Sequence, residues 1–155
     1  MREKRPVLDE IDKTILVRLQ ADSRTPLERI AKELSVPKST VHYRLKRLEE
    51  EEIIEGYHAK VNAAKLGKDY LTITFVRAKY GPSYHEKIGR MLAQIPNVFS
   101  VYFVFGDYDF VVLTRSDNTE DFLQKLEKMT RMTEIERTNT QVVGKTLKEN
   151  QKVEI

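Results

Sequence analysis

The chain has 155 residues, a formal net charge of +3 and no cysteine. A disulfide scaffold and thiolate metal sites are therefore excluded, and the lack of cysteine is typical of a reducing compartment. No apolar run approaches the roughly 18 residues that a membrane span requires, so we expect a cytoplasmic protein that makes no membrane contact. The length allows one sizeable core or two small ones, which favours support from partner subunits.

Two helices are predicted at the start of the chain. Apolar residues recur at helical spacing between Asp9 and Gln20, and acids near the start of this segment favour a helix N-terminus. A second helix is predicted from Pro26, with Thr25 as its N-cap. The expected buried stripes are Ile11, Ile15 and Leu19 in the first helix, and Leu27, Ile30, Ala31 and Leu34 in the second.

A third helix is predicted to start near Lys38 and to run to Glu52. Pro37 forbids continuation of the second helix, and it moves the preceding residue out of helical geometry. Ser35 and Val36 must then form a tight turn. Residues 1–55 are therefore predicted to be a three-helix domain of the helix-turn-helix type.

The third helix has a polar, basic face that suits a DNA major groove. Its apolar residues fall on one stripe, and the basic ones project from the opposite side before four glutamates, 49–52, end the basic run. We predict that Ser39, Thr40, His42 and Tyr43 read bases, and that Lys38, Lys46 and Arg47 hold phosphates. The alternative is an ordinary solvated surface, and Arg44 is as well placed to brace the preceding helix.

A linker with strand character is predicted over residues 56–68. Tyr57, Ala59 and Val61 alternate as a strand requires, between breaks at Gly56 and Gly67. Aromatic residues become frequent after this segment, and large aromatics favour sheets. A second domain is therefore expected to begin at residue 69.

The second domain, 69–146, is predicted to be ferredoxin-like. Ser83 and Glu86 have capping-box spacing before one apolar helical stripe, and residues 117–119 are expected to cap another helix. Strands are predicted over 70–79, 98–105, 110–114 and 135–146. The resulting order is βαββαβ, so the fold class is α+β. A polar, frayed tail is expected over 147–155.

A turn in this domain is a candidate small-ligand cradle. Gly106, Asp107, Tyr108 and Asp109 lie between two predicted strands, where glycine and aspartate are also common hairpin residues. In the functional interpretation, exposed N–H groups hold a carboxylate and an aspartate pairs with an ammonium group. Thr138 and Thr140 alternate on the last strand, with hydroxyls facing the same side as a second wall.

The sequence shows no pattern typical of an enzyme, a metal site or a bound cofactor. The three histidines are widely separated, and no aspartate pair lies near a catalytic partner in a recognisable order. A glycine-rich phosphate loop is absent as well. We therefore expect a binding protein.

The chain resembles the Lrp/AsnC (feast/famine) family of transcription regulators over nearly its whole length. The resemblance is carried by LDEIDKTILVRLQADSRTPLERIAKEL, STVHYRLKRLEEEEIIEGYHAKVN, GDYDF and ERTNTQVVGKTLKE. The segments TNTQVV, AKYG and LAQIPNV are similar to archaeal glutamine-receptive members. Two positions depart from the family pattern: Pro37 stands where many members have a capping serine, and Glu52 stands where glycine is usual.

The resemblance implies a regulator that binds double-stranded DNA and assembles as a homodimer into tetramers or octamers. It implies a connecting strand that pairs between subunits, and a free amino acid, possibly glutamine, bound between dimers near 106–109 and 138–140. The alternative function is an amino-acid-binding regulatory module without direct DNA binding, which would show no affinity for duplex DNA.

Overall fold

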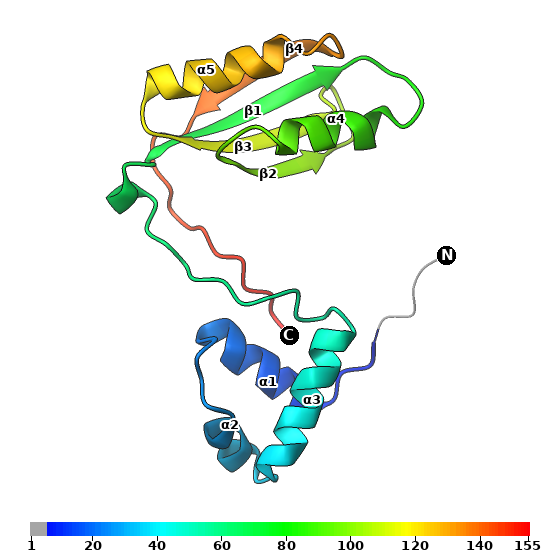
Figure 1. Ribbon diagram of the computed structural model, residues 1–155, viewed down its shortest axis with the longest axis vertical. Helices are drawn as coiled ribbons and strands as arrows, with labels where there is room; N and C mark the ends of the chain where they lie inside the picture. Colours follow the sequence, from blue (N-terminus) through cyan, green and yellow to red (C-terminus); the bar gives the residue numbers. More distant parts are fainter. Residues whose placement is uncertain (1–5) are drawn as a thin grey trace. The chain divides into compact units, whose positions relative to one another are not determined.

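The computed structural model describes residues 6–155, which divide into two compact units (Figure 1). The first unit contains the chain up to Lys60 together with Glu149–Ile155, and the second contains Val61–Lys148. Residues 1–5 of the predicted helical domain lie outside the described residues. No helix in the described part is both long and apolar enough to cross a membrane.

The first unit contains the three predicted helices. Their bounds are α1 (Glu10–Ala21), α2 (Leu27–Leu34) and α3 (Lys38–Glu50). The core consists of residues from all three helices, namely Ile15, Leu16, Ile30, Ala31, Val41 and Leu48. Ser35 adopts the left-handed conformation at the end of α2 (φ 54°), and this residue forms the predicted tight turn before α3. The helix-turn-helix arrangement is confirmed.

The predicted cap of α2 is wrong. Pro26 occupies the N-cap position and provides no side-chain hydrogen bond, and the helix begins at Leu27. The Thr25 hydroxyl instead donates to the Asp22 carbonyl oxygen at 2.7 Å, so this side chain stabilises the turn before α2. By contrast, α1 has a complete capping box: Asp9 accepts from the Asp12 N–H, and Asp12 accepts from the Asp9 N–H.

The third helix ends at Glu50, two residues before the predicted end. Glu52 lies beyond its C-cap with φ +54°, a conformation that costs a non-glycine residue about 1 kcal/mol. We expect Glu52→Gly to raise the free energy of unfolding by up to about 1 kcal/mol, since relief of strain exceeds the added chain entropy. Thermal unfolding measures this effect, and an unchanged or lower Tm would contradict it.

The predicted linker strand is not a strand in the single chain. Among the described residues, 56–68 form no strand hydrogen bonds with another segment, and Ala64–Leu66 form a short 3₁₀ helix. An alternating pattern forms a strand only when a neighbouring strand accepts its hydrogen bonds, and no described strand pairs with this segment.

The second unit has the predicted ferredoxin-like order. Its elements are β1 (Tyr70–Ala78), α4 (Tyr84–Ala93), β2 (Val98–Phe103), β3 (Phe110–Ser116), α5 (Thr119–Thr130) and β4 (Ile135–Val142). The strands form one antiparallel sheet in the order β2-β3-β1-β4, so β2 and β4 are its edges (Figure 1). The last strand ends four residues before the predicted bound.

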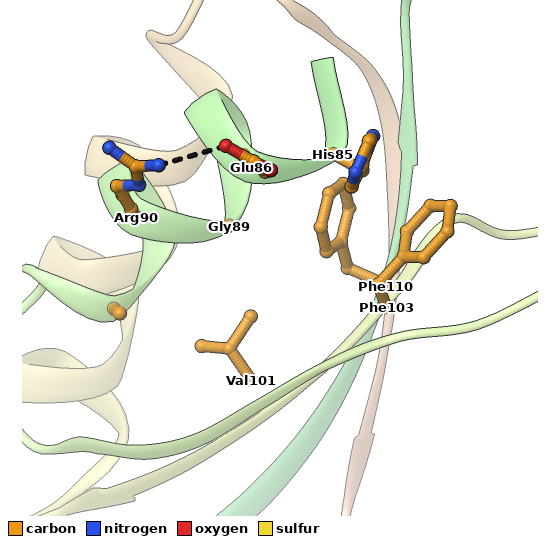
Figure 2. A pocket seen from close by; sticks show the side chains of 8 residues that line it. His85, Glu86, Gly89, Arg90, Val101, Phe103 and Phe110 are labelled. Carbon is orange, nitrogen blue, oxygen red and sulfur yellow. Dashed lines mark hydrogen bonds and ion pairs between the residues drawn. The ribbon is translucent and has the colours of Figure 1, made fainter. Parts of the chain in front are cut away.

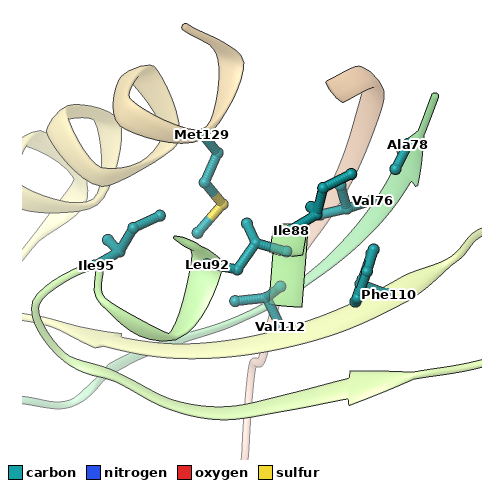
Figure 3. Close-up of a cluster of buried hydrophobic side chains, with 8 residues drawn as sticks. All are labelled: Val76, Ala78, Ile88, Leu92, Ile95, Phe110, Val112 and Met129. Atoms are coloured by element: carbon teal, nitrogen blue, oxygen red, sulfur yellow. The ribbon is translucent and has the colours of Figure 1, made fainter. Parts of the chain in front are cut away.

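Both helices of this unit pack on the same face of the sheet. Figure 3 shows Ile88 and Leu92 of α4 and Met129 of α5 directed toward Val76 and Val112. Side chains of β1 alternate, so Ile73 and Phe75 lie on the opposite, helix-free face and are half-buried. The helices therefore leave one face of the sheet open.

Only one of the two predicted caps in this unit is confirmed. Asn118 accepts from the Asp121 N–H at the start of α5, within the predicted capping segment. The capping box of Ser83 and Glu86 is wrong, because Ser83 is left-handed (φ 50°) and makes no side-chain cap bond. Capping-box spacing alone does not ensure the extended N-cap backbone that this motif requires.

The C-terminal tail makes hydrogen bonds to the first unit. The Gln20 side chain of α1 donates to the Val153 carbonyl oxygen at 3.0 Å and accepts from the Val153 N–H at 2.7 Å. Lys60 also donates to the Glu149 carbonyl oxygen at 3.3 Å. These backbone contacts explain why residues 149–155 group with the first unit, and tail composition alone cannot reveal them.

Candidate functional site

The outward face of α3 presents most of the residues that were predicted to contact DNA. The side chain of Tyr43 is 67% exposed, and Thr40 is half-buried. The remaining exposed members are Lys38, Ser39, His42 and Lys46. Ser39, His42, Tyr43 and Lys46 lie on the side of α3 opposite the buried residues Val41 and Leu48, whereas Lys38 lies in the first turn beside Glu28 of α2.

Arg47 does not belong to that free surface. Its Nη2 lies 2.6 Å from Oδ2 of Asp12, a fully buried carboxylate on α1, and the Arg47 side chain is only 30% exposed. A buried carboxylate is costly unless a cation pairs with it. If Arg47 moved away to a phosphate, Asp12 would lose its nearest cation and its burial would become less favourable. Arg47 therefore braces α3 against α1, and its contact with a phosphate stays a prediction.

Arg44 completes this brace. Its Nη1 lies 2.7 Å from Oδ2 of Asp9 and 3.4 Å from Asp12. The backbone N–H of Asp12, together with the guanidinium of Arg44, lowers the pKa of Asp9. The N-terminal carboxylates of α1 thus hold two arginines of α3 and fix how α3 presents its outer face.

The two lysines of the exposed face make only surface ion pairs. Lys38 pairs with Glu28 of α2, and Lys46 lies 3.3 Å from Glu50 one turn along α3. All four side chains are more than half exposed. Pairs of this kind contribute little, so either ammonium group can exchange its carboxylate for a phosphate.

The turn in the second unit is held by a buried Asp109. Asp109 is only 4% exposed, and its Oδ2 accepts a hydrogen bond from the Ala78 N–H at 2.8 Å. The Tyr84 hydroxyl donates to Oδ1 at 3.3 Å, and burial with the nearby Asp109 carboxylate raises the pKa of Tyr84. Asp109 therefore positions the turn, whereas Asp107 beside it is exposed.

Removing the Asp109 carboxylate should destabilise the second unit. Asp109→Ala leaves the buried Ala78 N–H without an acceptor, and we expect the free energy of unfolding to fall by about 2 kcal/mol. Asp107→Ala is the matched control, with an expected change within about 0.5 kcal/mol because the side chain is exposed. Chemical denaturation measures both, and equal effects of the two substitutions would contradict the positioning role.

The structure places the other predicted effector residues on two faces of the sheet. Thr140 meets Thr74 through its hydroxyl at 3.0 Å on the helix-covered side, and Thr138 lies on the same side, two residues away. Tyr108 packs instead on Phe75 of the open face, with ring centroids 5.6 Å apart. The predicted residues thus do not form one continuous wall.

Two arginines near the turn were not predicted from the sequence. Arg77 donates to the Asp107 carbonyl oxygen at 2.8 Å, and the Arg137 guanidinium lies 5.3 Å from the Tyr108 ring centroid. They are cross-strand partners on β1 and β4, which could have been inferred only with the strand register in hand. Together they give the turn cationic neighbours that suit a carboxylate ligand.

Comparison with protein families matches both units. Residues 8–49 match the AsnC-type helix-turn-helix domain, and residues 73–153 match the Lrp/AsnC ligand binding domain. The chain is 36% identical over 145 residues to the HTH-type transcriptional regulator FL11 of Pyrococcus furiosus, covering 94% of this chain and 95% of that one. A second HTH-type regulator, from Pyrococcus abyssi, is 37% identical over 96% of this chain and 99% of its own length.

Solved structures share the fold over nearly the whole chain. The feast or famine regulatory protein of M. tuberculosis complexed with L-methionine is 25% identical, with a TM-score of 0.85 over 95% of this chain and 99% of that one. E. coli AsnC is 23% identical, with a TM-score of 0.86 over 94% and 97%. From its two matching domains and its full-length relatives, the chain belongs to the Lrp/AsnC family of helix-turn-helix transcriptional regulators.

Proposed function

We propose that this regulator binds specific DNA sequences by placing α3 in the major groove, and that a free amino acid modulates its DNA binding or assembly. The DNA-binding part of the proposal is supported by the separate roles of two groups of residues on α3. Arg44 and Arg47 fix the helix through Asp9 and buried Asp12, while Ser39, His42, Tyr43 and Lys46 remain exposed. A rigid helix with exposed donors is the arrangement that direct base readout requires.

The proposed effector site is the turn at residues 106–109 with its neighbours. Exposed Asp107 suits the ammonium group of an amino acid, and Arg137 beside Tyr108 suits its carboxylate. Asp109 supports the turn by accepting from the Ala78 N–H, and Thr138 and Thr140 of the predicted site lie on the helix-covered face of β4, opposite the face that Tyr108 contacts. The methionine complex of the M. tuberculosis relative supports an amino-acid ligand, and glutamine is the first candidate from the sequence resemblance.

The open face of the sheet supports the proposed homodimer. Ile73, Phe75, Val111 and Leu113 are half-buried on this face, and Tyr102 on the edge strand is 55% exposed. An apolar sheet face of this kind is stabilised when a second copy covers it. Two helix-turn-helix domains in one dimer would require a roughly palindromic operator, with half-sites about one helical turn or its multiple apart.

Footprinting with and without amino acids tests the proposal. A duplex recovered by selection from a random pool is probed with the full chain alone and with each of the twenty amino acids. We expect paired protected segments, and a change in their extent or affinity with at least one amino acid, because an effector that binds two states differently shifts their balance. Unchanged protection in all twenty would contradict the effector part, and absence of protection would contradict the DNA-binding part.

A further inference from the structure

The tail, residues 149–155, is held by α1 through both polar groups of one side chain. The Gln20 amide donates to the Val153 carbonyl oxygen at 3.0 Å and accepts from the Val153 N–H at 2.7 Å. Opposite residues of an antiparallel strand pair exchange the same two hydrogen bonds, so this side-chain amide replaces a strand neighbour for the tail. Gln20 itself is half-buried in the last turn of α1.

The contacts of the tail with the first unit are made by its main chain. Val153 is 69% exposed, so its side chain contributes little to the docking. The second contact, from Lys60 Nζ to the Glu149 carbonyl oxygen at 3.3 Å, is also made to a main-chain atom. Main-chain hydrogen bonds can hold a segment with little regard to its side chains. Docking therefore requires the N–H of residue 153, whereas another exposed side chain at this position is tolerated.

The tail docks on the end of α1 that also contacts α2. Arg18, just before Gln20, donates from Nε to both carboxylate oxygens of Glu33 on α2, at 2.8 and 3.0 Å. At the other end of α1, Asp9 and Asp12 hold the arginines of α3. The position of α1 therefore affects both helices of the helix-turn-helix, and a contact that restrains α1 also restrains α3.

We propose that the tail is a strap of the DNA-binding unit: its docking on Gln20 stabilises the three helices, and its release lowers the affinity of α3 for DNA. The two hydrogen bonds lie at the surface, where each contributes little, so the strap opens more readily than the unit unfolds. The stabilisation is independent of how the protein binds DNA, whereas the effect on affinity rests on the proposed function of α3.

Hydrogen exchange of the Val153 amide in the full chain, followed by ¹H–¹⁵N NMR, tests the docking itself. Gln20→Ala removes the acceptor of this N–H, so exchange should become about fivefold faster, the factor that corresponds to one net hydrogen bond. Gln124→Ala, an exposed glutamine on α5, is the matched control and should leave the rate unchanged. An equal rate in Gln20→Ala and the unmodified chain would overturn the docking.

Thermal unfolding of two variants of one residue tests whether the docked main chain stabilises the first unit. Val153→Pro removes the N–H that donates to Gln20, so the Tm of the helical unit should fall by about 4 °C. Val153→Ala keeps the N–H and loses only an exposed side chain, so its Tm should stay within about 1 °C. Equal Tm values for the two variants would overturn the stabilising role.

Affinity for a selected duplex tests the effect of the strap on α3. Gln20→Ala, and separately a chain that ends at Asn150, should each bind about three- to fivefold more weakly than the unmodified chain. Glu86→Gln removes an exposed ion pair with Arg90 on α4 of the second unit (Figure 2) and should bind like the unmodified chain.

The outcomes of this affinity measurement separate the strap from the proposed function. Unchanged affinity in both strap variants, with the unmodified chain binding the duplex, would overturn the link between the tail and α3. If the unmodified chain bound no duplex, the proposed function of α3 would fail and the DNA part of the strap proposal with it, whereas the exchange and Tm results would still decide the stabilising role.

Discussion

Replacing Asp12 with alanine should unfold the helix-turn-helix unit at a much lower temperature. Asp12 is fully buried, closes the capping box of α1 and pairs with Arg44 and Arg47. Its removal takes the nearest carboxylate from the partly buried Arg47 guanidinium and leaves Arg44 with Asp9 alone, so we expect the free energy of unfolding of this unit to fall by about 3 kcal/mol. Helical circular dichroism during heating should then show an early transition for the first unit.

Glu10→Ala is the matched control for this substitution. Glu10 also lies in the first turn of α1, but its side chain is 85% exposed and pairs only with Lys13 at the surface. Its expected effect is within about 0.5 kcal/mol. The brace between α1 and α3 would be refuted if Asp12→Ala and Glu10→Ala melted alike.

Truncation of Tyr43 should reduce sequence-specific binding strongly. Tyr43 is the one tyrosine of α3 and is 67% exposed, and loss of one base-reading contact costs about 1–3 kcal/mol. We therefore expect Tyr43→Ala to weaken binding to a selected duplex by about tenfold or more, with little change on random DNA. His42→Ala, on the same face, should act in the same direction. Fluorescence anisotropy with both duplexes measures the two affinities.

Tyr80→Ala provides the comparison for Tyr43→Ala. Tyr80 has the same 67% exposure, but it lies in the second unit next to Arg77 and Tyr84. It should leave affinity for the selected duplex within about twofold, since it lies on no predicted DNA contact surface. Comparable losses in the two variants would show that Tyr43 has no special role in DNA recognition.

The sequence predicts elements well where one local pattern determines them. Pro37 and the turn at Ser35 locate the start of α3, and alternating apolar residues locate the strands of the sheet. Asp107 and Asp109 show the limit of local pattern, because both suit a hairpin turn equally well. Only the Ala78 N–H on a strand 31 residues away makes Asp109 a buried support and leaves Asp107 exposed.

The same limit applies to Arg47, whose ion pair with Asp12 the sequence did not predict. A helical wheel places it beside Lys46 on the polar side of α3, and nothing within α3 separates their roles. Its partner Asp12 lies 35 residues earlier on α1, and a helical wheel of α3 does not show contacts with another helix. The tail is a similar case, because Gln20 holds Val153 through backbone groups that any residue would provide.

The salt dependence of DNA binding tests the role of α3 most directly. For the full chain and a selected duplex, the slope of log K against log salt reports the number of phosphates neutralised, at about 0.9 for each. Lys46→Ala should reduce the magnitude of this slope by about 0.9, and Lys128→Ala, an exposed lysine on α5, should leave it unchanged. Equal slopes for Lys46→Ala and the unmodified chain, or no duplex affinity at any salt concentration, would contradict the account.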